Sequence, residues 1–260
     1  MDEEKTKEFK DIYARFYLES TYSKNDEDER RKLGVDNECT NDAVENFALN
    51  ELNSFRKSES NSEVKLDERL IAWKAGRLEP EMVKNKSSCE KFLNGYGKEI
   101  KNLLKYIEAI NDKDFLKNIR EKIDKHEVEQ AYNDLKELNI KYKVDNLGSV
   151  YIITLLYFIS GGKYPIYDKF AHKAVKALYF NENPQDIYVG EAPGKRETKK
   201  VMAIYREYCW LLKEVFGTYD IPRNLDQALW VYGHCKKKYG DESGEDSIRN
   251  IFNCSNKSIS

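Results

Sequence analysis

The sequence predicts an all-α protein, and three features of its residues lead to that prediction. Charged residues make up 35% of the chain, whereas it has only 13 glycines and 5 prolines, the residues that most often interrupt helices. Apolar residues recur at three- and four-residue spacing in most segments, which is the period of one helical face. The hydrophobic fraction of 40% favours an ordered core over a disordered chain.

Helical periodicity begins near the N-terminus, where an amphipathic helix with an aromatic-rich stripe is expected over residues 3–20. A polar loop should follow over 23–37. The sequence Asp42–Glu45 has the spacing of a capping box and predicts a second helix behind it. The polar run S-E-S-N-S-E over 58–63 should be a crossing between two parts of the chain. The stripe consists of Phe9, Ile12, Tyr13, Phe16 and Tyr17.

The middle of the chain shows further helical stripes, which predict helices around residues 70–76, 100–107, 115–123 and 128–138. Residues 149–160 then run almost wholly apolar for about three turns. This run is too apolar for a surface helix and too short to span a bilayer. We therefore expect it to be a buried central helix.

The residues around this apolar run predict a turn, a stop and a restart. Asn146-Leu147-Gly148 suits a tight turn, because Asn and Gly tolerate left-handed backbone. Gly161-Gly162 should end the apolar helix, and Pro165 should fix an extended connector. Asp168 lies where a helix over Lys169–Phe180 needs an acceptor for its free amide groups, so we expect it to be the N-cap. Helices over 197–216 and 225–239 and a polar tail over 241–260 should complete the chain.

The formal net charge of −2 argues against a nucleic-acid partner, because phosphate binding depends on Lys and Arg. The distribution of charge argues the other way. Residues 1–30 carry an excess of acids, whereas Lys141–Lys176 holds six lysines against two aspartates. No apolar run resembles a signal peptide or a membrane span, so we expect a soluble, cytoplasmic protein.

Three patterns that often mark binding sites lead to no site here. The five cysteines are scattered and form no C-x-x-C pair, so free thiols are expected. Gly190–Lys195 is one residue short of a phosphate loop and follows no apolar strand. The three histidines have no partner at metal-ligand spacing, and surface or capping roles are expected for His126, His172 and His234.

The interval from the turn to Asp168 resembles the helix-hairpin-helix DNA glycosylases, the superfamily of endonuclease III, adenine DNA glycosylase and 8-oxoguanine DNA glycosylase. V-D-N-L-G at Val144–Gly148 lies where that family has a hairpin of the form L-P-G-V-G, and its last Gly matches. Gly161 and P-I-x-D at Pro165–Asp168 follow at the family's spacing without a gap. Leu225–Gly233 is similar to the family's N-Q-A-x-x-x-x-G segment.

The resemblance implies two helical lobes with a cleft between them. One is a six-helix lobe over 65–162 that contains the helix-hairpin-helix, and the other combines 1–64 with 163–260. The implied partner is duplex DNA that contains a damaged or mismatched base, bound by a monomer in the cytoplasm, or at the nucleoid in a prokaryote. With only Cys235 and Cys254 near the C-terminus, no iron–sulfur cluster is expected. The resemblance allows a monovalent cation at the hairpin.

The resemblance also implies roles for individual residues. Asp168 falls on the catalytic acid of the family, although spacing alone would make it only a helix cap worth about 1 kcal/mol. Val150 stands where strand-cleaving members have a Lys, so base removal without strand cleavage is expected. The family's wedge residue is a Gln, and Arg77 is its candidate substitute. The implied DNA contacts are Asn146, Leu147, Gly148, Ser149, Val150, Lys163, Lys169 and Lys173.

Two alternatives to an enzyme stay open at this point. A catalytically inert helix-hairpin-helix DNA-binding protein would fit the imperfect hairpin and the missing Gln. A protein-interaction domain that keeps only the fold would fit the near-neutral charge. A salt-dependent shift with duplex DNA separates the last alternative from the other readings, and release of a free base identifies the enzyme.

Overall fold

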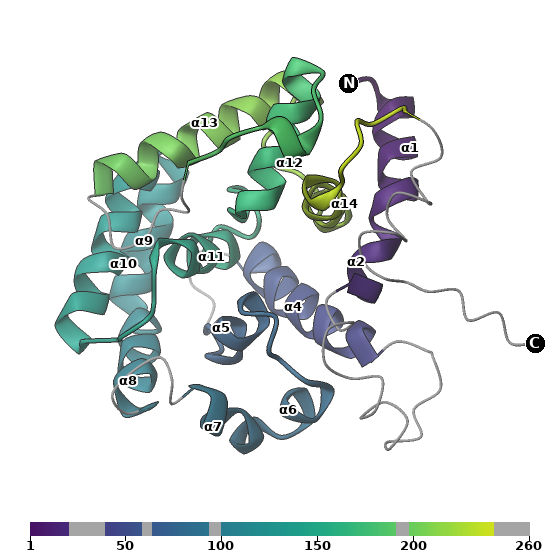
Figure 1. Cartoon of the computed structure of the whole chain (residues 1–260). Helices are drawn as coiled ribbons and strands as arrows, with labels where there is room; N and C mark the ends of the chain where they lie inside the picture. The colour runs from purple at the N-terminus through teal and green to yellow at the C-terminus, as the bar shows by residue number, and fades with distance from the viewer. Residues whose placement is uncertain (21–39, 59–63, 94–99, 191–197, 242–260) are drawn as a thin grey trace, which may run out of the picture. The chain divides into compact units, whose positions relative to one another are not determined.

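The computed structural model describes residues 1–20, 40–58, 64–93, 100–190 and 198–241, and all regular structure in these residues is helical (Figure 1). The all-α prediction is confirmed. The α-helices, labelled as in Figure 1, are α1 (Glu3–Tyr13), α2 (Arg15–Ser20), α4 (Thr40–Lys57), α5 (Arg69–Lys74), α6 (Pro80–Lys84), α7 (Glu90–Leu93), α8 (Ile100–Ile110), α9 (Lys113–Asp124), α10 (Val128–Tyr142), α11 (Ser149–Ile159), α12 (Lys169–Phe180), α13 (Thr198–Phe216) and α14 (Arg223–His234). Two short 3₁₀ helices are η1 (Lys86–Cys89) and η3 (Pro184–Asp186).

Residue contacts divide the chain into two compact units, each of which is described by itself. Unit 1 comprises Met1–Cys39, Tyr167–Ala192 and Arg206–Ser260, and unit 2 comprises Thr40–Ile166 and Pro193–Tyr205. These boundaries differ from the expected division at residues 65 and 162. One difference arises at α4, which contacts α5, α6 and α11 and therefore groups with unit 2. A second arises at Pro193–Tyr205, which also groups with unit 2 although it was expected in the other lobe.

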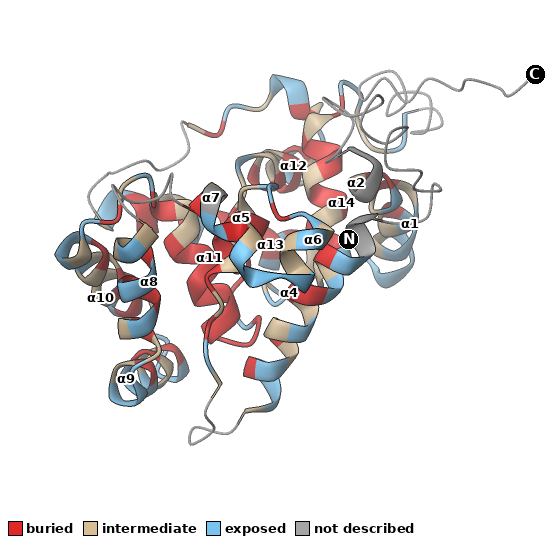
Figure 2. Cartoon of the chain, turned by 90° about the horizontal axis from the view of Figure 1, so that it is seen from below, coloured by how far each residue is buried: buried red, intermediate tan, exposed pale blue. Residues whose placement is uncertain are grey.

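Helix α11 is the centre of unit 2. Nine of its residues are buried, and it contacts α4, α5, α9 and α10 (Figure 2). The prediction of a buried central helix is therefore confirmed. The helix ends at Gly161 and Gly162, whose φ values of 63° and 87° lie in the left-handed region that glycine tolerates. The Nε of Arg56 donates to the carbonyl of Gly161 at 2.9 Å and joins α4 to this helix end.

Helix α14 is the centre of unit 1, where it contacts α1, α2 and α12. Aromatic side chains fill the space between α1 and α14. The ring of Tyr232 lies 5.5 Å from that of Phe9 and 5.1 Å from that of Tyr13, measured between centroids. These two aromatic residues of α1 belong to the stripe that predicted the first helix, and both are buried.

Several predicted boundaries needed correction. The helix expected over 3–20 is divided in two at Ala14, and α4 begins at Thr40, before the expected capping box. The last helix ends at His234 because Cys235 takes an extended conformation. Short helices α6 and α7 were not expected, since each has too few residues to show a period. The loop over 23–37, most of the crossing over 58–63 and most of the tail lie outside the described residues.

Among the described residues, no helix is both long enough and apolar enough to cross a membrane.

Candidate functional site

The turn between α10 and α11 occupies the position of the expected hairpin. Lys143 ends α10 in the left-handed conformation with φ 54°, and Asn146 takes a second left-handed position with φ 61°. Gly148 has a φ of −76° and is the N-cap of α11. The expectation of left-handed backbone is therefore correct for Asn146 and wrong for Gly148.

A buried amide holds this turn in shape. The side chain of Asn139 is 8% exposed, and its Nδ2 donates to the carbonyl of Leu147 at 3.0 Å. The backbone N–H of Val144 donates to the carbonyl of Asn139 at 3.3 Å. Leu147 is itself buried and anchors the end of the turn in the core of unit 2. Sequence reasoning missed Asn139, because a single Asn within a helical stripe gives no sign of its tertiary partner.

The first turn of α11 is open on the side of Gly148. A Cβ atom placed on Gly148 would meet nothing within 4 Å. Ser149 is buried, and its hydroxyl forms a hydrogen bond with Tyr132, whereas Val150 is half-buried and Asn146 is exposed. Contacts to a ligand at this turn would therefore involve the backbone and Asn146 rather than the side chains of Leu147 and Ser149.

Asp168 caps α12, as the sequence predicts. Its backbone is extended, with φ −137° and ψ 140°, and its Oδ1 accepts a hydrogen bond from the backbone N–H of Phe170 at 2.8 Å. The carboxylate is half-buried and thus keeps part of its surface accessible. The helix behind it has the predicted bounds, Lys169–Phe180. Asp168 belongs to unit 1 and the turn to unit 2, so their expected meeting at a cleft stays a prediction.

Helix α14 touches the first turn of α12 at Gly233. A Cβ atom on Gly233 would lie 2.0 Å from the carbonyl oxygen of Phe170, closer than real Cβ atoms approach. Only glycine allows the two backbones to come this near. The resemblance singled out the segment that contains Gly233, and the contact gives the physical reason for glycine at that position.

An aromatic stack covers the same turn. The ring of Phe170 stacks on His234 with 3.5 Å between centroids and 26° between planes, and Trp230 lies 4.2 Å from His234. His234 Nδ1 is 2.8 Å from the carbonyl of Trp230, so this nitrogen carries the proton that the bond requires. All three rings are half-buried. Two residues beyond the Asp168 carboxylate, the protein thus presents partly accessible aromatic surface.

His172 is a core residue, which corrects the expected surface or capping role. It is 1% exposed, and its Nδ1 lies 3.3 Å from the hydroxyl of Tyr167. Burial lowers the pKa of His172 to about 4, although the charge of Glu207 raises it. The ring is therefore neutral at pH 7, and its 3.9 Å approach to Glu207 is no ion pair. Within the described residues, neither His172 Nε2 nor the buried Tyr208 hydroxyl has a hydrogen-bond partner.

The three lysines expected to contact DNA have different surroundings. Lys163 forms an exposed ion pair with Asp124, with 2.7 Å between Nζ and Oδ1. Lys169 is exposed, and Lys173 is half-buried with its Nζ 3.5 Å from Gln185. Burial and the charge of Lys169 lower the pKa of Lys173. Lys169 and Lys173 therefore repel each other, although the charge of Asp186 acts on Lys173 in the opposite sense, whereas Asp124 forms an ion pair with Lys163.

Arg77, the candidate wedge, is exposed on the turn that follows α5. Its backbone N–H donates to the carbonyl of Ala72 at 2.9 Å, and Gly76 before it has a φ of 64°. The next residue, Leu78, is buried and fixes the turn to the core of unit 2. Arg77 thus extends from a well-held turn, and its role as a wedge stays a prediction.

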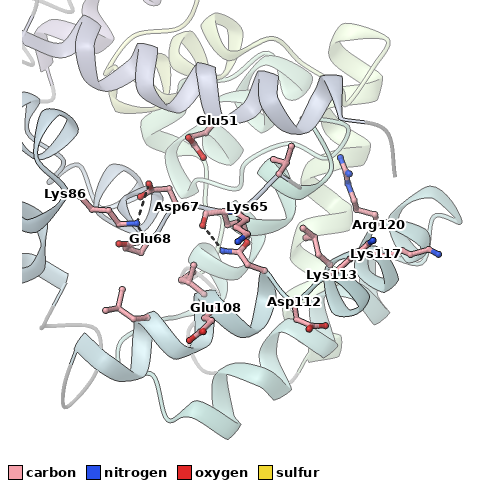
Figure 3. A pocket seen from close by; sticks show the side chains of 16 residues that line it. Glu51, Lys65, Asp67, Glu68, Lys86, Glu108, Asp112, Lys113, Lys117 and Arg120 are labelled. Atoms are coloured by element: carbon pink, nitrogen blue, oxygen red, sulfur yellow. Dashed lines mark hydrogen bonds and ion pairs between the residues drawn. The ribbon is translucent and has the colours of Figure 1, made fainter. Parts of the chain in front are cut away.

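Unit 2 contains a pocket of about 750 Å³ that is lined by residues of α4, α8, α9 and the segment before α5 (Figure 3). Its lining holds five acidic and five basic side chains, and some of them form ion pairs. Asp67 accepts two hydrogen bonds from the guanidinium of Arg69, at 2.9 and 2.7 Å, and Lys86 Nζ lies 2.8 Å from Glu68. Burial and the charge of Asp67 raise the pKa of Glu51, which lines the same pocket. None of the predicted site residues lines the pocket, and a lining with as many acidic as basic side chains favours no particular ligand.

No family model, curated protein or solved structure matches the chain in comparisons of its sequence and fold. No group of three or more His, Cys, Asp or Glu in the described part of the chain is placed to hold a metal ion.

Proposed function

We propose that the chain is a DNA glycosylase that hydrolyses the bond between a damaged or mismatched base and its sugar. The observation that carries the proposal is the placement of Asp168. Its carboxylate is half-buried and held at the start of α12 by the Phe170 amide at 2.8 Å. The contact between Gly233 and Phe170 fixes the same turn from behind. A carboxylate fixed in this way suits a reaction that builds positive charge on a sugar.

The proposed reaction assigns one task to Asp168. As the base departs with the electron pair of the broken bond, the sugar ring becomes positively charged, and the carboxylate stabilises that charge. Water adds its oxygen to the sugar carbon and gives up one proton, which Asp168 accepts and which the departing base finally carries. The products are a free base and an abasic site.

The turn before α11 supports the proposal through its backbone. Amide groups at the start of a helix bind phosphate without help from net charge, which suits a chain whose formal charge is −2. The open space at Gly148 lets a phosphate come close to these amides. Lys169 and Lys173 supply further positive charge at the start of α12.

The proposed enzyme has no strand-cleaving activity. Strand cleavage by a glycosylase of this kind needs an amine that attacks the sugar and forms a Schiff base. Val150, whose side chain is apolar, stands at the position where the resembled enzymes have that amine. The abasic product should therefore stay intact until alkali or heat breaks the strand.

A panel of single-lesion duplexes tests the proposal. Each duplex carries one oxidised, deaminated, alkylated or mismatched base, and the expected result is a free base from at least one of them, with strand breaks only after alkali. Borohydride trapping of a protein–DNA adduct would contradict the absence of strand-cleaving activity. Salt-dependent duplex binding without base release from any lesion would leave an inert helix-hairpin-helix DNA-binding protein.

A further inference from the structure

Three aromatic side chains form an exposed cluster on unit 1, at the end of α12 and on α13. Tyr179, Phe180 and Trp210 are 41%, 52% and 47% exposed. The ring of Tyr179 lies 5.2 Å from Trp210 and 5.0 Å from Phe180, measured between centroids. Contiguous exposed aromatic surface of this kind is uncommon on a folded protein and usually marks a binding site.

A row of lysines leads to this cluster along α12. Lys169, Lys173, Lys176 and Phe180 are spaced by four, three and four residues, so they share one face of the helix. The row extends for about 16 Å at the rise of an α-helix. The same face of α12 thus presents cations first and aromatic rings at its end.

The positive charge of this row is only partly offset. Lys176 pairs with Glu207 at 2.8 Å, whereas Lys173 forms a hydrogen bond with the neutral amide of Gln185 and feels the charge of Asp186 without an ion pair among the described residues. Lys169 is exposed and has no hydrogen-bond or ion-pair partner among the described residues. The mutual repulsion of Lys169 and Lys173, which helps to lower the pKa of Lys173, would be relieved by a bound anion.

The second helix of the surface adds charge around its aromatic residue. On α13, exposed Arg206 and Lys213 lie one turn before and one turn after Trp210, and exposed Glu207 and Glu214 lie beside them. The surface therefore combines cations with planar rings on two adjacent helices. Base stacking on aromatic rings together with phosphate binding by Lys and Arg is the chemistry that holds single-stranded nucleic acid.

We propose that this surface, named here the aromatic–lysine face, binds a single strand of DNA. Phosphates contact Lys169 and Lys173, and bases stack on Tyr179, Phe180 and Trp210. A second copy of the chain is a poorer fit, because a protein interface would have to desolvate the lysine ammonium groups, and interface cores are depleted of Lys. The choice of DNA over RNA rests on the proposed function. The inference that the surface binds a single strand rests on its aromatic rings and lysines and does not depend on that function.

The experiment measures binding of a fluorescein-labelled strand of twelve thymidines to the full chain by anisotropy at low salt. A homopolymer strand forms no duplex and contains no lesion, so the assay does not depend on glycosylase activity. Trp210→Ala and Tyr179→Ala should each weaken binding about tenfold, and Trp210→Phe should restore most of it. Lys173→Gln should lower the slope of log affinity against log salt concentration by roughly one unit. A strand of twelve uridines serves as the RNA comparison and should bind no tighter than the strand of twelve thymidines.

Tyr188→Ala is the matched control, because Tyr188 is 80% exposed and has no ring contact with the cluster among the described residues. This variant should bind the strand as the parent does.

Two results would overturn the proposal: no binding of the strand by the parent, or equal binding by the Trp210, Tyr179 and Tyr188 variants. A dimer in light scattering that Trp210→Ala converts to a monomer, with strand binding unchanged, would assign the surface to a second copy instead. Base release by the parent together with either overturning result would leave the proposed function standing.

Discussion

The backbone of Gly233 lies so close to Phe170 that a Cβ atom there would be 2.0 Å from the Phe170 carbonyl oxygen. The contact joins α14 to the turn of α12 that Asp168 caps. The atoms that this Cβ would meet belong to the backbone of Phe170 rather than to a flexible side chain, so they cannot move aside without shifting α12. The position of the Asp168 carboxylate thus depends on a residue in the last helix of the described chain.

Gly233→Ala should destabilise the fold. The added methyl group must push α14 away from α12, and overpacking of this kind costs about 1–3 kcal/mol. Gly148→Ala is the matched control, because its Cβ would meet nothing within 4 Å and its φ of −76° suits alanine. Denaturant unfolding should show a loss for the first variant and almost none for the second. Equal unfolding free energies of the two variants would mean that α14 can move away from α12 without destabilising the fold.

The burial of His172 makes the folded state sensitive to acid. Its pKa is lowered from 6.5 to about 4 by burial, so the unfolded chain binds a proton more readily than the folded one. Above pH 6.5, His172 therefore does not lower the free energy of unfolding. That free energy falls as the pH drops from 6.5 towards 4. The expected loss between pH 7 and pH 5 is about 2 kcal/mol.

His172→Gln isolates that contribution. Glutamine is polar but does not titrate, so the variant should show a flatter dependence of unfolding free energy on pH between 6.5 and 4. The measurement compares denaturant unfolding of the parent and the variant at pH 7 and pH 5. An equal loss of stability in both proteins would assign the acid sensitivity to other groups.

Local signals in the sequence predicted the centre of the chain well. The apolar run of α11, the glycines after it and the cap at Asp168 each depend on neighbouring residues, and α12 has the predicted bounds. Tertiary contacts explain what was missed. His172 is buried because its face of α12 packs against Tyr208 of α13, with ring centroids 5.5 Å apart. No spacing rule reveals which helix will cover a given face.

The candidate site shows the same limit. The sequence indicated Asp168 and the turn before α11, because caps and turns use recognisable residue types. It did not reveal Asn139, whose amide reaches the Leu147 carbonyl, or the stack of Phe170 on His234. These contacts join residues on different elements, so the sequence places the participants without showing that they meet.

Duplex binding should depend unequally on the three candidate lysines. Lys169→Gln and Lys173→Gln should each lower the slope of log affinity against log salt concentration by roughly one unit, because each removes a cation that forms no ion pair among the described residues. Lys163→Gln should have a smaller effect, since Asp124 lies 2.7 Å from its Nζ. Lys117→Gln is the control, because Lys117 is exposed and pairs with Glu121 on α9. Binding titrations from low to moderate salt would measure the slopes, and four equal slopes would leave these charges as solvated surface.

Asp168→Asn separates the two tasks of this residue. Asparagine caps helices as well as aspartate does, so its side-chain oxygen can still accept from the Phe170 amide, and the fold and duplex binding should be retained. The amide carries no charge, so the positive sugar ring of the transition state loses its stabilising partner. Base release should fall by about two or more orders of magnitude, as when other charge-stabilising groups are removed.

Asp168→Ala completes the comparison, because alanine removes the cap together with the charge. It should lose base release like the Asn variant and, in addition, about 1 kcal/mol of unfolding free energy. Single-turnover base release and denaturant unfolding, measured on both variants, therefore separate catalysis from capping. If Asp168→Asn released the base as fast as the parent while Asp168→Ala was merely less stable, the carboxylate would have no catalytic task, and Asp168 would be a helix cap alone.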